Sequence, residues 1–304
     1  MGQTGQLNRC CPVCGAQKAT DFLRKDTLRL VSCNQCEMVY ATPVPAEMVS
    51  GKYYDEAGSY YLSPAKLESD YASVRFEREL RRFRAHCASG SVLDVGCSTG
   101  AFLFQLKSRY PGSYEVLGAD ASGPALDYAE SRGIAVARGD FLEQGFAEGT
   151  FDAVTFWAVL EHLCEPAQFL DKAWSILKPE GVCMVLVPNL CSLAVRILGS
   201  RYRYVYPQHL NYFSPAALER LVSSRFSVIE RRSMHFNPVV IWQDWRSTGA
   251  EVSDVARARL LKRTTGYKQN PWLKPAKALY SLAERALGGA MLADNLFLAL
   301  RKRG

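Results

Sequence analysis

The chain has 304 residues, of which 48% are hydrophobic and 22% charged, a composition typical of a globular protein with one substantial core and a smaller second unit. No apolar run reaches the roughly 18 residues that a membrane-spanning helix needs, and the N-terminus lacks a charged segment followed by an apolar one. The net charge is +7, and ten cysteines without a secretory signal predict reduced thiols and a cytoplasmic location.

Two C-x-x-C turns near the N-terminus predict a metal site. Cys11 and Cys14 form the first turn, and Cys33 and Cys36 form the second after 18 intervening residues. Four thiolates converging from such turns hold Zn²⁺ tetrahedrally and leave no open coordination position, so we expect a structural zinc. A unit of about 40 residues needs such a metal cross-link for stability, because its own hydrophobic core is small. We therefore predict a zinc ribbon over residues 1–42.

Residues 43–88 are predicted to link this ribbon to the next domain. They begin with a stiff, proline-containing extended joint. Residues 68–87 carry five arginines and an inner apolar face formed by Val74, Leu80 and Phe83, a spacing that predicts one helix. This helix is expected to lie across an edge of the sheet with its charges in solvent.

The stretch from Val92 to Gly100 predicts a buried strand that ends in a glycine turn before a helix. Asp94 stands near the end of the strand, and Gly96 and Gly100 let the main chain approach a ligand closely. A second apolar strand ends in Asp120, the place where a doubly wound fold contacts a ribose. A nicotinamide cofactor is disfavoured, because the third and sixth positions of a G-x-G-x-x-G motif are serine and alanine here.

Strands and helices continue to alternate along the rest of the chain. The further strands are predicted at residues 134–137, 151–157, 182–187, 226–231 and 296–301. Short turns between such elements favour an α/β fold whose largely parallel sheet is covered by helices on both faces.

The pattern D-x-G-C-x-x-G at residues 94–100 resembles the first motif of the class I S-adenosylmethionine-dependent methyltransferases, and the likeness extends over residues 89–190. It implies a Rossmann-like methyltransferase domain over residues 89–304 and S-adenosylmethionine as cofactor. The cofactor-binding residues that it implies are Asp94, Gly96, Cys97, Gly100, Asp120, Ala121, Asp140, Phe141 and Trp157. Those of the glycine turn would frame the methionine part, Asp120 would bind the ribose, and the pair at 140–141 would hold the adenine.

In enzymes of this type the segment before the glycine turn often covers the cofactor. The resemblance therefore implies that residues 43–88 act as linker and helical lid, with Tyr54 or Tyr61 in contact with the site.

His209 is the predicted general base, because methyl transfer to an O–H, N–H or acidic C–H group releases a proton. It follows the fifth strand and precedes a helix with Ser214 as its cap and Pro215 at its first position, which places it at the mouth of the sheet. The stretch H-L-N-Y-F-S resembles a loop of sugar C-methyltransferases that also carry an N-terminal zinc unit, in which a glutamate precedes this histidine. Gln208 stands there instead, and a purely structural His209 is the alternative.

Two tyrosines complete the predicted site, and His162 is a weaker candidate outside it. Tyr206 and Tyr212 flank His209 and are expected to bind the acceptor. His162 follows Glu161 in a pair that recurs in small-molecule methyltransferases, where it shapes the cofactor pocket.

Residues 236–292 are predicted to form a basic helical insert before the last strand. Residues 236–304 hold 12 basic and 5 acidic side chains, and seven lysines or arginines but no acid lie between Val255 and Ala283. Three interpretations stay open: a pocket for an anionic acceptor, peripheral contact with an anionic membrane, or a helical layer with a solvated basic face.

The sequence as a whole favours methyl transfer to a small-molecule acceptor such as a sugar, a glycan or a lipid precursor. Two alternatives are an RNA methyltransferase that uses the ribbon for its substrate and a non-catalytic cofactor-binding scaffold. Nucleic acid is not the favoured partner, because the ribbon lacks a marked basic excess and the N/D-P-P-Y/F tetrapeptide is missing. The sequence gives no indication of the oligomeric state.

Overall fold

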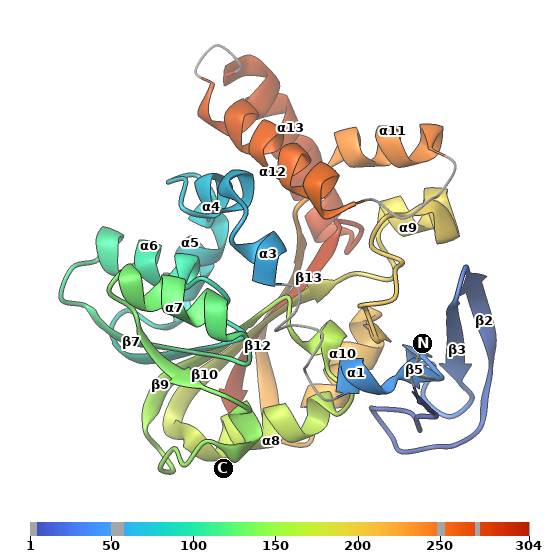
Figure 1. Ribbon diagram of the computed structural model, residues 1–304, viewed down its shortest axis with the longest axis horizontal. Coiled ribbons are helices and arrows are strands. Elements are labelled where there is room, and N and C mark those ends of the chain that lie inside the picture. The colour runs from blue at the N-terminus through green and yellow to red at the C-terminus, as the bar shows by residue number, and fades with distance from the viewer. Residues whose placement is uncertain (1–4, 50–57, 248–252, 271–273, 304) are drawn as a thin grey trace.

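A computed structural model describes residues 5–49, 58–247, 253–270 and 274–303. Its centre is a seven-stranded sheet (Figure 1). In spatial order the strands are β12 (Phe226–Met234), β13 (Asn295–Lys302), β10 (Leu177–Pro188), β9 (Phe151–Trp157), β6 (Gly90–Val95), β7 (Tyr114–Asp120) and β8 (Ala135–Arg138).

The sheet is parallel except at β13, which runs antiparallel to both β10 and β12. From β6 the chain first builds outward through β7 and β8, and it then crosses back to β9 and β10 on the other side. Ligands of doubly wound folds bind at such a switch point, beyond the carboxyl ends of the strands. The predicted Rossmann-like α/β fold is confirmed, with the insert before the last strand.

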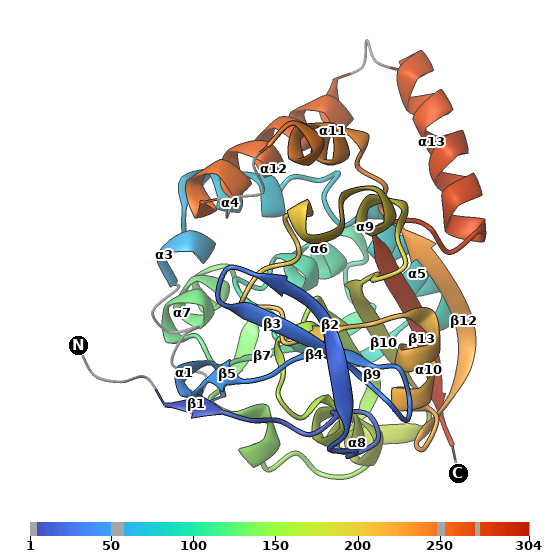
Figure 2. The same ribbon diagram turned by 90° about the vertical axis from the view of Figure 1, so that its right-hand side faces the viewer.

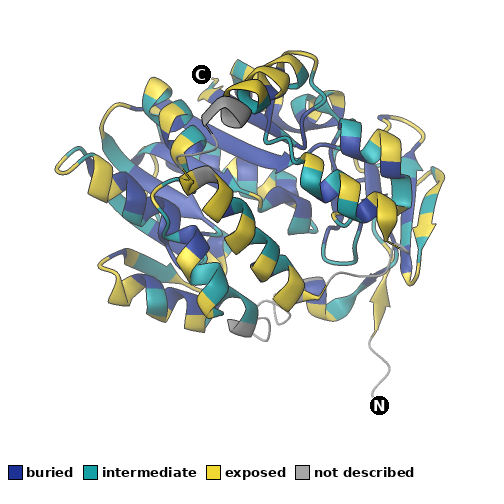
Figure 3. Cartoon of the chain, turned by 90° about the horizontal axis from the view of Figure 1, so that it is seen from above, coloured by how far each residue is buried: buried dark blue, intermediate teal, exposed yellow. Residues whose placement is uncertain are grey.

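Helices cover both faces of this sheet. One layer contains α5 (Glu77–His86), α6 (Ala101–Arg109) and α7 (Gly123–Ser131), and the other contains α8 (Pro166–Ile176) and α10 (Pro215–Val222). Neighbouring strand residues alternate between the layers: Val92 packs with α5–α7, and Leu93 packs with α8 and α10. Figure 3 shows the buried strands between helices whose outer faces are exposed.

The N-terminal ribbon is built into the rest of the molecule. Its strands β2 (Ala19–Lys25), β3 (Leu28–Cys33) and β4 (Val39–Ala41) are joined by β11 (Asn211–Tyr212), which comes from the segment after β10 (Figure 2). A second small sheet pairs β1 (Gln6–Leu7) with β5 (Val44–Pro45), and α1 (Ala46–Val49) follows. The ribbon and the loop before β11 therefore depend on each other for their positions.

The segment before β6 differs from the single predicted helix. It contains α3 (Gly58–Tyr61), α4 (Pro64–Asp70) and then a turn before α5. The Gln105 side chain of α6 donates hydrogen bonds to the carbonyls of Asp70 and Ala72 (3.0 and 2.8 Å), which satisfies groups that a continuous helix would have bonded internally. In the same turn the Tyr71 hydroxyl donates to the Thr99 carbonyl (2.5 Å). This bond attaches the turn between α4 and α5 to the glycine turn after β6.

The insert consists of α11 (Pro238–Arg246), α12 (Asp254–Gln269) and α13 (Lys274–Gly289), and α9 (Leu193–Leu198) lies near α11. Short 3-10 helices η1 (Phe141–Glu143), η2 (Leu160–His162) and η3 (Gly199–Arg201) complete the structure. Helix α12 packs against α3 and α4, and Figure 2 shows α13 standing apart from them. Within the described ranges, no helix has both the length and the apolar character needed to cross a bilayer.

Candidate active site

The glycine turn after β6 makes two close approaches. At Gly96, where φ is +72°, an added Cβ would lie 2.5 Å from Val159 Cγ2, so only glycine fits between the turn and the segment after β9. At Gly100, where φ is +74°, a Cβ would meet Ala129 at 3.0 Å and Ile134 at 3.3 Å. Gly100 therefore packs behind the turn, and it does not line the cavity described below.

Two carboxylates lie at the ends of the central strands. Asp94 is buried and accepts a hydrogen bond from the Thr155 hydroxyl (2.7 Å), yet burial raises the pKa of its carboxyl to about 7. Asp120 accepts backbone N–H groups from Ser98 (2.8 Å) and Ser122 (2.9 Å), one on each side. These bonds fix the Asp120 carboxylate at the end of β7, beside the glycine turn.

A cavity of about 730 Å³ opens beyond the carboxyl ends of β6, β7 and β9. Eight of the nine predicted cofactor-binding residues line it: Asp94, Gly96, Cys97, Asp120, Ala121, Asp140, Phe141 and Trp157. Among the described residues, Ser98 Oγ, Ser122 Oγ and Trp157 Nε1 are buried on its wall without a hydrogen-bond partner. Unsatisfied polar atoms around a cavity of this size suit a polar ligand.

The far end of the cavity contains the pair Asp140–Phe141. Asp140 is exposed and caps η1 by accepting the N–H of Leu142 (2.9 Å). Phe141 is largely buried, with its ring centroid 5.5 Å from that of Phe169 and 6.3 Å from that of Phe156. The aromatic ring thus belongs both to the core and to the cavity wall.

The segment before β6, the predicted lid, supplies six residues of the cavity wall, and sequence patterns pointed to Tyr61 alone among them. The six are Met48, Tyr61, Lys66, Asp70, Arg75 and Phe76. Of the two lid tyrosines considered from the sequence, Tyr61 lies on the wall and Tyr54 is outside the described residues. The i,i+4 spacing of Lys66 and Asp70 on α4 is the one signal that marks this charged pair in the sequence.

His162 lines the cavity, whereas His209 does not and lies behind the His162 ring. Their ring centroids are 4.9 Å apart, and the His209 ring is 4.3 Å from that of Tyr206. Neither His209, Tyr206 nor Tyr212 is on the cavity wall; the Tyr212 hydroxyl instead donates to the Tyr206 carbonyl (3.1 Å) and holds the loop.

The protonation of His162 follows from its hydrogen bond. Its Nδ1 lies 2.8 Å from the Gln208 carbonyl, which can only accept, so Nδ1 carries the proton and Nε2 of the neutral ring carries the lone pair. Burial lowers the pKa of His162 to about 4 and that of His209 well below its usual value. Both rings are therefore neutral at physiological pH.

Glu161 brings a carboxyl group to the same place. It is buried, and its carboxylate and the ring nitrogens of His162 and His209 offer atoms that all lie within 4.8 Å of one another. Burial raises the pKa of Glu161 to about 8. Sequence reasoning found no acid beside His209 because position 208 is glutamine; the fold supplies one from the segment after β9. The three side chains can hold and move a proton.

Arg9 connects the ribbon to this cluster. Its guanidinium donates to the carbonyls of Cys164 (2.7 Å) and Leu210 (3.2 Å) and to Asn211 Oδ1 (3.0 Å). Asn211 in turn donates to the Leu160 and Leu163 carbonyls (2.8 and 2.7 Å). The ribbon therefore supports the two segments that carry the histidines.

The four predicted metal ligands converge. Sulfur atoms Cys11 Sγ and Cys36 Sγ are 3.4 Å apart, Cys14 Sγ and Cys33 Sγ are 3.6 Å apart, and all four lie within 4.8 Å of one another. Tetrahedral bonds of about 2.3 Å to zinc require sulfur–sulfur separations of about 3.8 Å, so the donor set fits the ion.

Known proteins resemble this chain in sequence. A family model described as a methyltransferase domain matches residues 69–225, slightly more than half of the chain. A ubiquinone biosynthesis O-methyltransferase of Roseobacter denitrificans is 28% identical over 228 residues, covering 68% of this chain and 89% of the relative. A demethylmenaquinone methyltransferase of Thermus thermophilus is 33% identical over 139 residues, covering 44% of this chain and 63% of the relative.

The fold also matches solved structures. A chain in the complex between the Haloferax volcanii Trm112 methyltransferase activator and a putative methyltransferase superimposes with a TM-score of 0.53 at 15% identity, covering 82% of this chain and 99% of that chain. The strand order, the cavity at the switch point and the matching family model agree. The chain belongs to the class I S-adenosylmethionine-dependent methyltransferases.

Proposed function

We propose that the protein transfers the methyl group of S-adenosylmethionine to a hydroxyl group of a small-molecule acceptor, with His162 receiving the acceptor's proton. The observation that carries this proposal is the neutral His162 on the cavity wall, with its lone pair on Nε2. Bound in the cavity, the cofactor supplies an electrophilic methyl group on a sulfonium sulfur. The chain itself must orient the acceptor and remove one proton.

The cofactor would lie along the carboxyl ends of β6, β7 and β9. Asp94 and the glycine turn would hold its methionine part, Asp120 its ribose, and Asp140 with Phe141 its adenine. The unpartnered polar atoms of Ser98, Ser122 and Trp157 support this placement, because a polar ligand would satisfy them.

Replacing Asp120 with alanine should weaken cofactor binding about 10- to 100-fold, the loss that removing a charged hydrogen-bond acceptor of about 1.5–3 kcal/mol predicts. Isothermal titration with S-adenosylhomocysteine measures it. Asp127→Ala is the matched control, because Asp127 is an exposed aspartate on the neighbouring helix α7. Unchanged affinity in Asp120→Ala would remove this residue from the cofactor site.

In the proposed reaction the acceptor oxygen attacks the methyl carbon, the carbon–sulfur bond breaks with its electron pair on sulfur, and the hydroxyl proton passes to His162 Nε2. His209, the base predicted from the sequence, would then act through His162 by packing against its ring. Glu161 would hold a proton beside both rings.

The acceptor is proposed to be a sugar, a glycan or a lipid precursor, processed in the cytoplasm. Support for a small hydroxyl-bearing acceptor comes from the relative named as an O-methyltransferase of ubiquinone biosynthesis. Methyl-labelled S-adenosylmethionine, incubated with the protein and fractionated extract of its source organism, tests the proposal. Label should enter the small-molecule or glycolipid fraction. Label in RNA, or no transfer despite cofactor binding, would replace it by one of the two alternatives.

We further propose that the four cysteines bind one structural zinc ion. Their convergence and the absence of disulfides among the described cysteines support this assignment. A closed four-thiolate site leaves the ion no position for substrate, so its role would be to hold the ribbon against β11.

A further inference from the structure

Arg257 in the first half of α12 reaches the segment that carries His209. Its guanidinium carbon lies 4.2 Å from the centroid of the Tyr206 ring, and the centroids of the Tyr206 and His209 rings are 4.3 Å apart. Helix α12 packs against α3 and α4, whose residues Tyr61 and Lys66 belong to the cavity wall (Figure 2). Arg257 thus stands where the insert, the lid and the histidine cluster meet.

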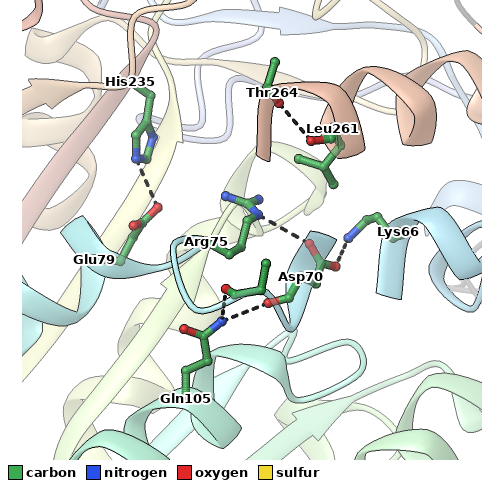
Figure 4. Close-up of polar contacts among 9 residues, drawn as sticks. Lys66, Asp70, Arg75, Glu79, Gln105, His235, Leu261 and Thr264 are labelled. Carbon is green, nitrogen blue, oxygen red and sulfur yellow. Dashed lines mark hydrogen bonds and ion pairs between the residues drawn. The ribbon is translucent and has the colours of Figure 1, made fainter. Parts of the chain in front are cut away.

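Arg257 has no acidic or hydrogen-bonding partner for its guanidinium among the described residues, although it is half-buried. Other buried or half-buried cations in this part of the molecule have carboxylate partners. Arg203 is paired with Asp244 (2.8 Å), and Asp70 lies between Lys66 and Arg75, bonding to both (Figure 4). Partial burial of an unpaired charge is costly, because the lost hydration is not replaced.

The positive charge of Arg257 also acts on the cluster below it. Burial lowers the pKa of both His162 and His209, and the charge of Arg257 lowers both further; it also opposes the rise in the pKa of Tyr206 that burial causes. The guanidinium is close to the histidine cluster through the Tyr206 ring, although neither Arg257 nor Tyr206 is part of the cavity wall. An anion placed there would be attracted by Arg257 without meeting an ionised carboxylate from Glu161 at neutral pH.

We propose that Arg257 binds an anionic group, a carboxylate or a phosphate, of the methyl acceptor, an inference that rests on the proposed function. The cation–π contact with Tyr206 fixes the position of the guanidinium group, whose N–H groups would form two parallel bonds to such an anion. The acceptor's hydroxyl would then face His162 while its anionic group lies under α12. This assigns the basic insert a role in selecting the acceptor.

Inorganic pyrophosphate and benzoate serve as probes of this site. We would titrate each into the S-adenosylhomocysteine complex of the wild type, Arg257→Ala, Arg257→Lys and Arg259→Ala by calorimetry. Arg259 is the matched control, because it is exposed on the same helix and its loss changes the net charge equally. We expect Arg257→Ala to weaken binding of at least one probe by about 10-fold or more and Arg257→Lys to retain part of it. Equal effects of Arg257→Ala and Arg259→Ala would overturn the proposal.

The labelled product separates this inference from the proposed function. It should bind an anion-exchange resin at neutral pH; phosphatase treatment distinguishes a phosphate from a carboxylate, and partition into organic solvent distinguishes a lipid carrier from a water-soluble acceptor. Arg257→Ala should raise the KM for this fraction about 10-fold or more without changing cofactor affinity. A neutral small-molecule product would overturn the inference and leave the proposed function standing. If no small molecule is labelled, both fail.

Discussion

Replacing His162 with alanine should reduce turnover by about 10²- to 10⁴-fold, the range over which a positioned general base contributes, while cofactor affinity changes far less. The side chain lies on the cavity wall with its lone pair on Nε2, and within the described structure its one histidine neighbour, His209, is behind it. Label transfer from S-adenosylmethionine gives kcat, and titration with S-adenosylhomocysteine gives the affinity.

Two further variants identify the base. His86→Ala is the control, because His86 is bonded to Glu230 (2.8 Å) outside the cavity and should leave turnover unchanged. His209→Ala should reduce turnover less than His162→Ala, since it removes packing behind the base. The reverse order would make His209 the base, as the sequence predicts, and normal turnover in both variants would exclude a histidine base.

The pH profile provides an independent check. Burial lowers the pKa of His162 to about 4, so the neutral ring predominates above that pH, and kcat at saturating S-adenosylmethionine should stay level between pH 7.5 and about 5. Burial raises the pKa of Asp94 to about 7, so protonation of this proposed cofactor residue would change the affinity for the cofactor over the same interval. A histidine with the usual pKa near 6.5 would lose activity over the same interval. Glu161, with a pKa of about 8, ionises only above neutrality and would then increase the basicity of its neighbours. A fall of kcat centred near pH 6.5 at saturating S-adenosylmethionine would contradict this assignment.

Loss of the proposed zinc should unfold the ribbon and reduce turnover by more than about tenfold, without an equal loss of cofactor affinity. Structural zinc supplies about 10 kcal/mol or more of folding free energy in small zinc-binding units. The ribbon contacts the proposed site through Arg9, Asn211 and the pairing of β4 with β11, whereas the proposed cofactor residues lie at or just after the carboxyl ends of β6, β7, β8 and β9. Cys33→Ser, with metal content by mass spectrometry and hydrogen exchange over β2–β4, measures the effect.

Arg9→Ala tests the connection without removing a metal ligand. Arg9 donates to main-chain carbonyls on both histidine-bearing segments, so the variant should retain zinc and lose turnover. Arg24→Ala is the control, because Arg24 is an exposed ribbon arginine whose one ion-pair partner among the described residues is Asp21 of the ribbon itself (2.7 Å). Full activity of Arg9→Ala would mean that the ribbon does not position the site, and a zinc-free protein with intact ribbon protection would refute the metal assignment.

Local patterns in the sequence predicted the elements that build the proposed cofactor site. The glycine turn, the strand-ending acids and the alternation of strands and helices each depend on spacing within a few residues, because backbone conformation and strand burial are set locally. The cysteine pairs were also predictable from local spacing, since each C-x-x-C turn by itself brings two thiols together. The break between α4 and α5 was not predicted, because the Gln105 amide that satisfies the freed carbonyls comes from another helix.

The amino-acid sequence by itself determined the family, the fold and most of the wall residues proposed to bind the cofactor. The tertiary structure alone decided the surroundings of the proposed base. It brought Glu161 beside His209, placed His162 in front of it, joined Arg9 to Asn211 across 202 positions, and laid Arg257 over Tyr206. These contacts join side chains from the ribbon, two loops and the insert, whose relative positions depend on how apolar faces pack together, and spacing within any one segment does not encode them.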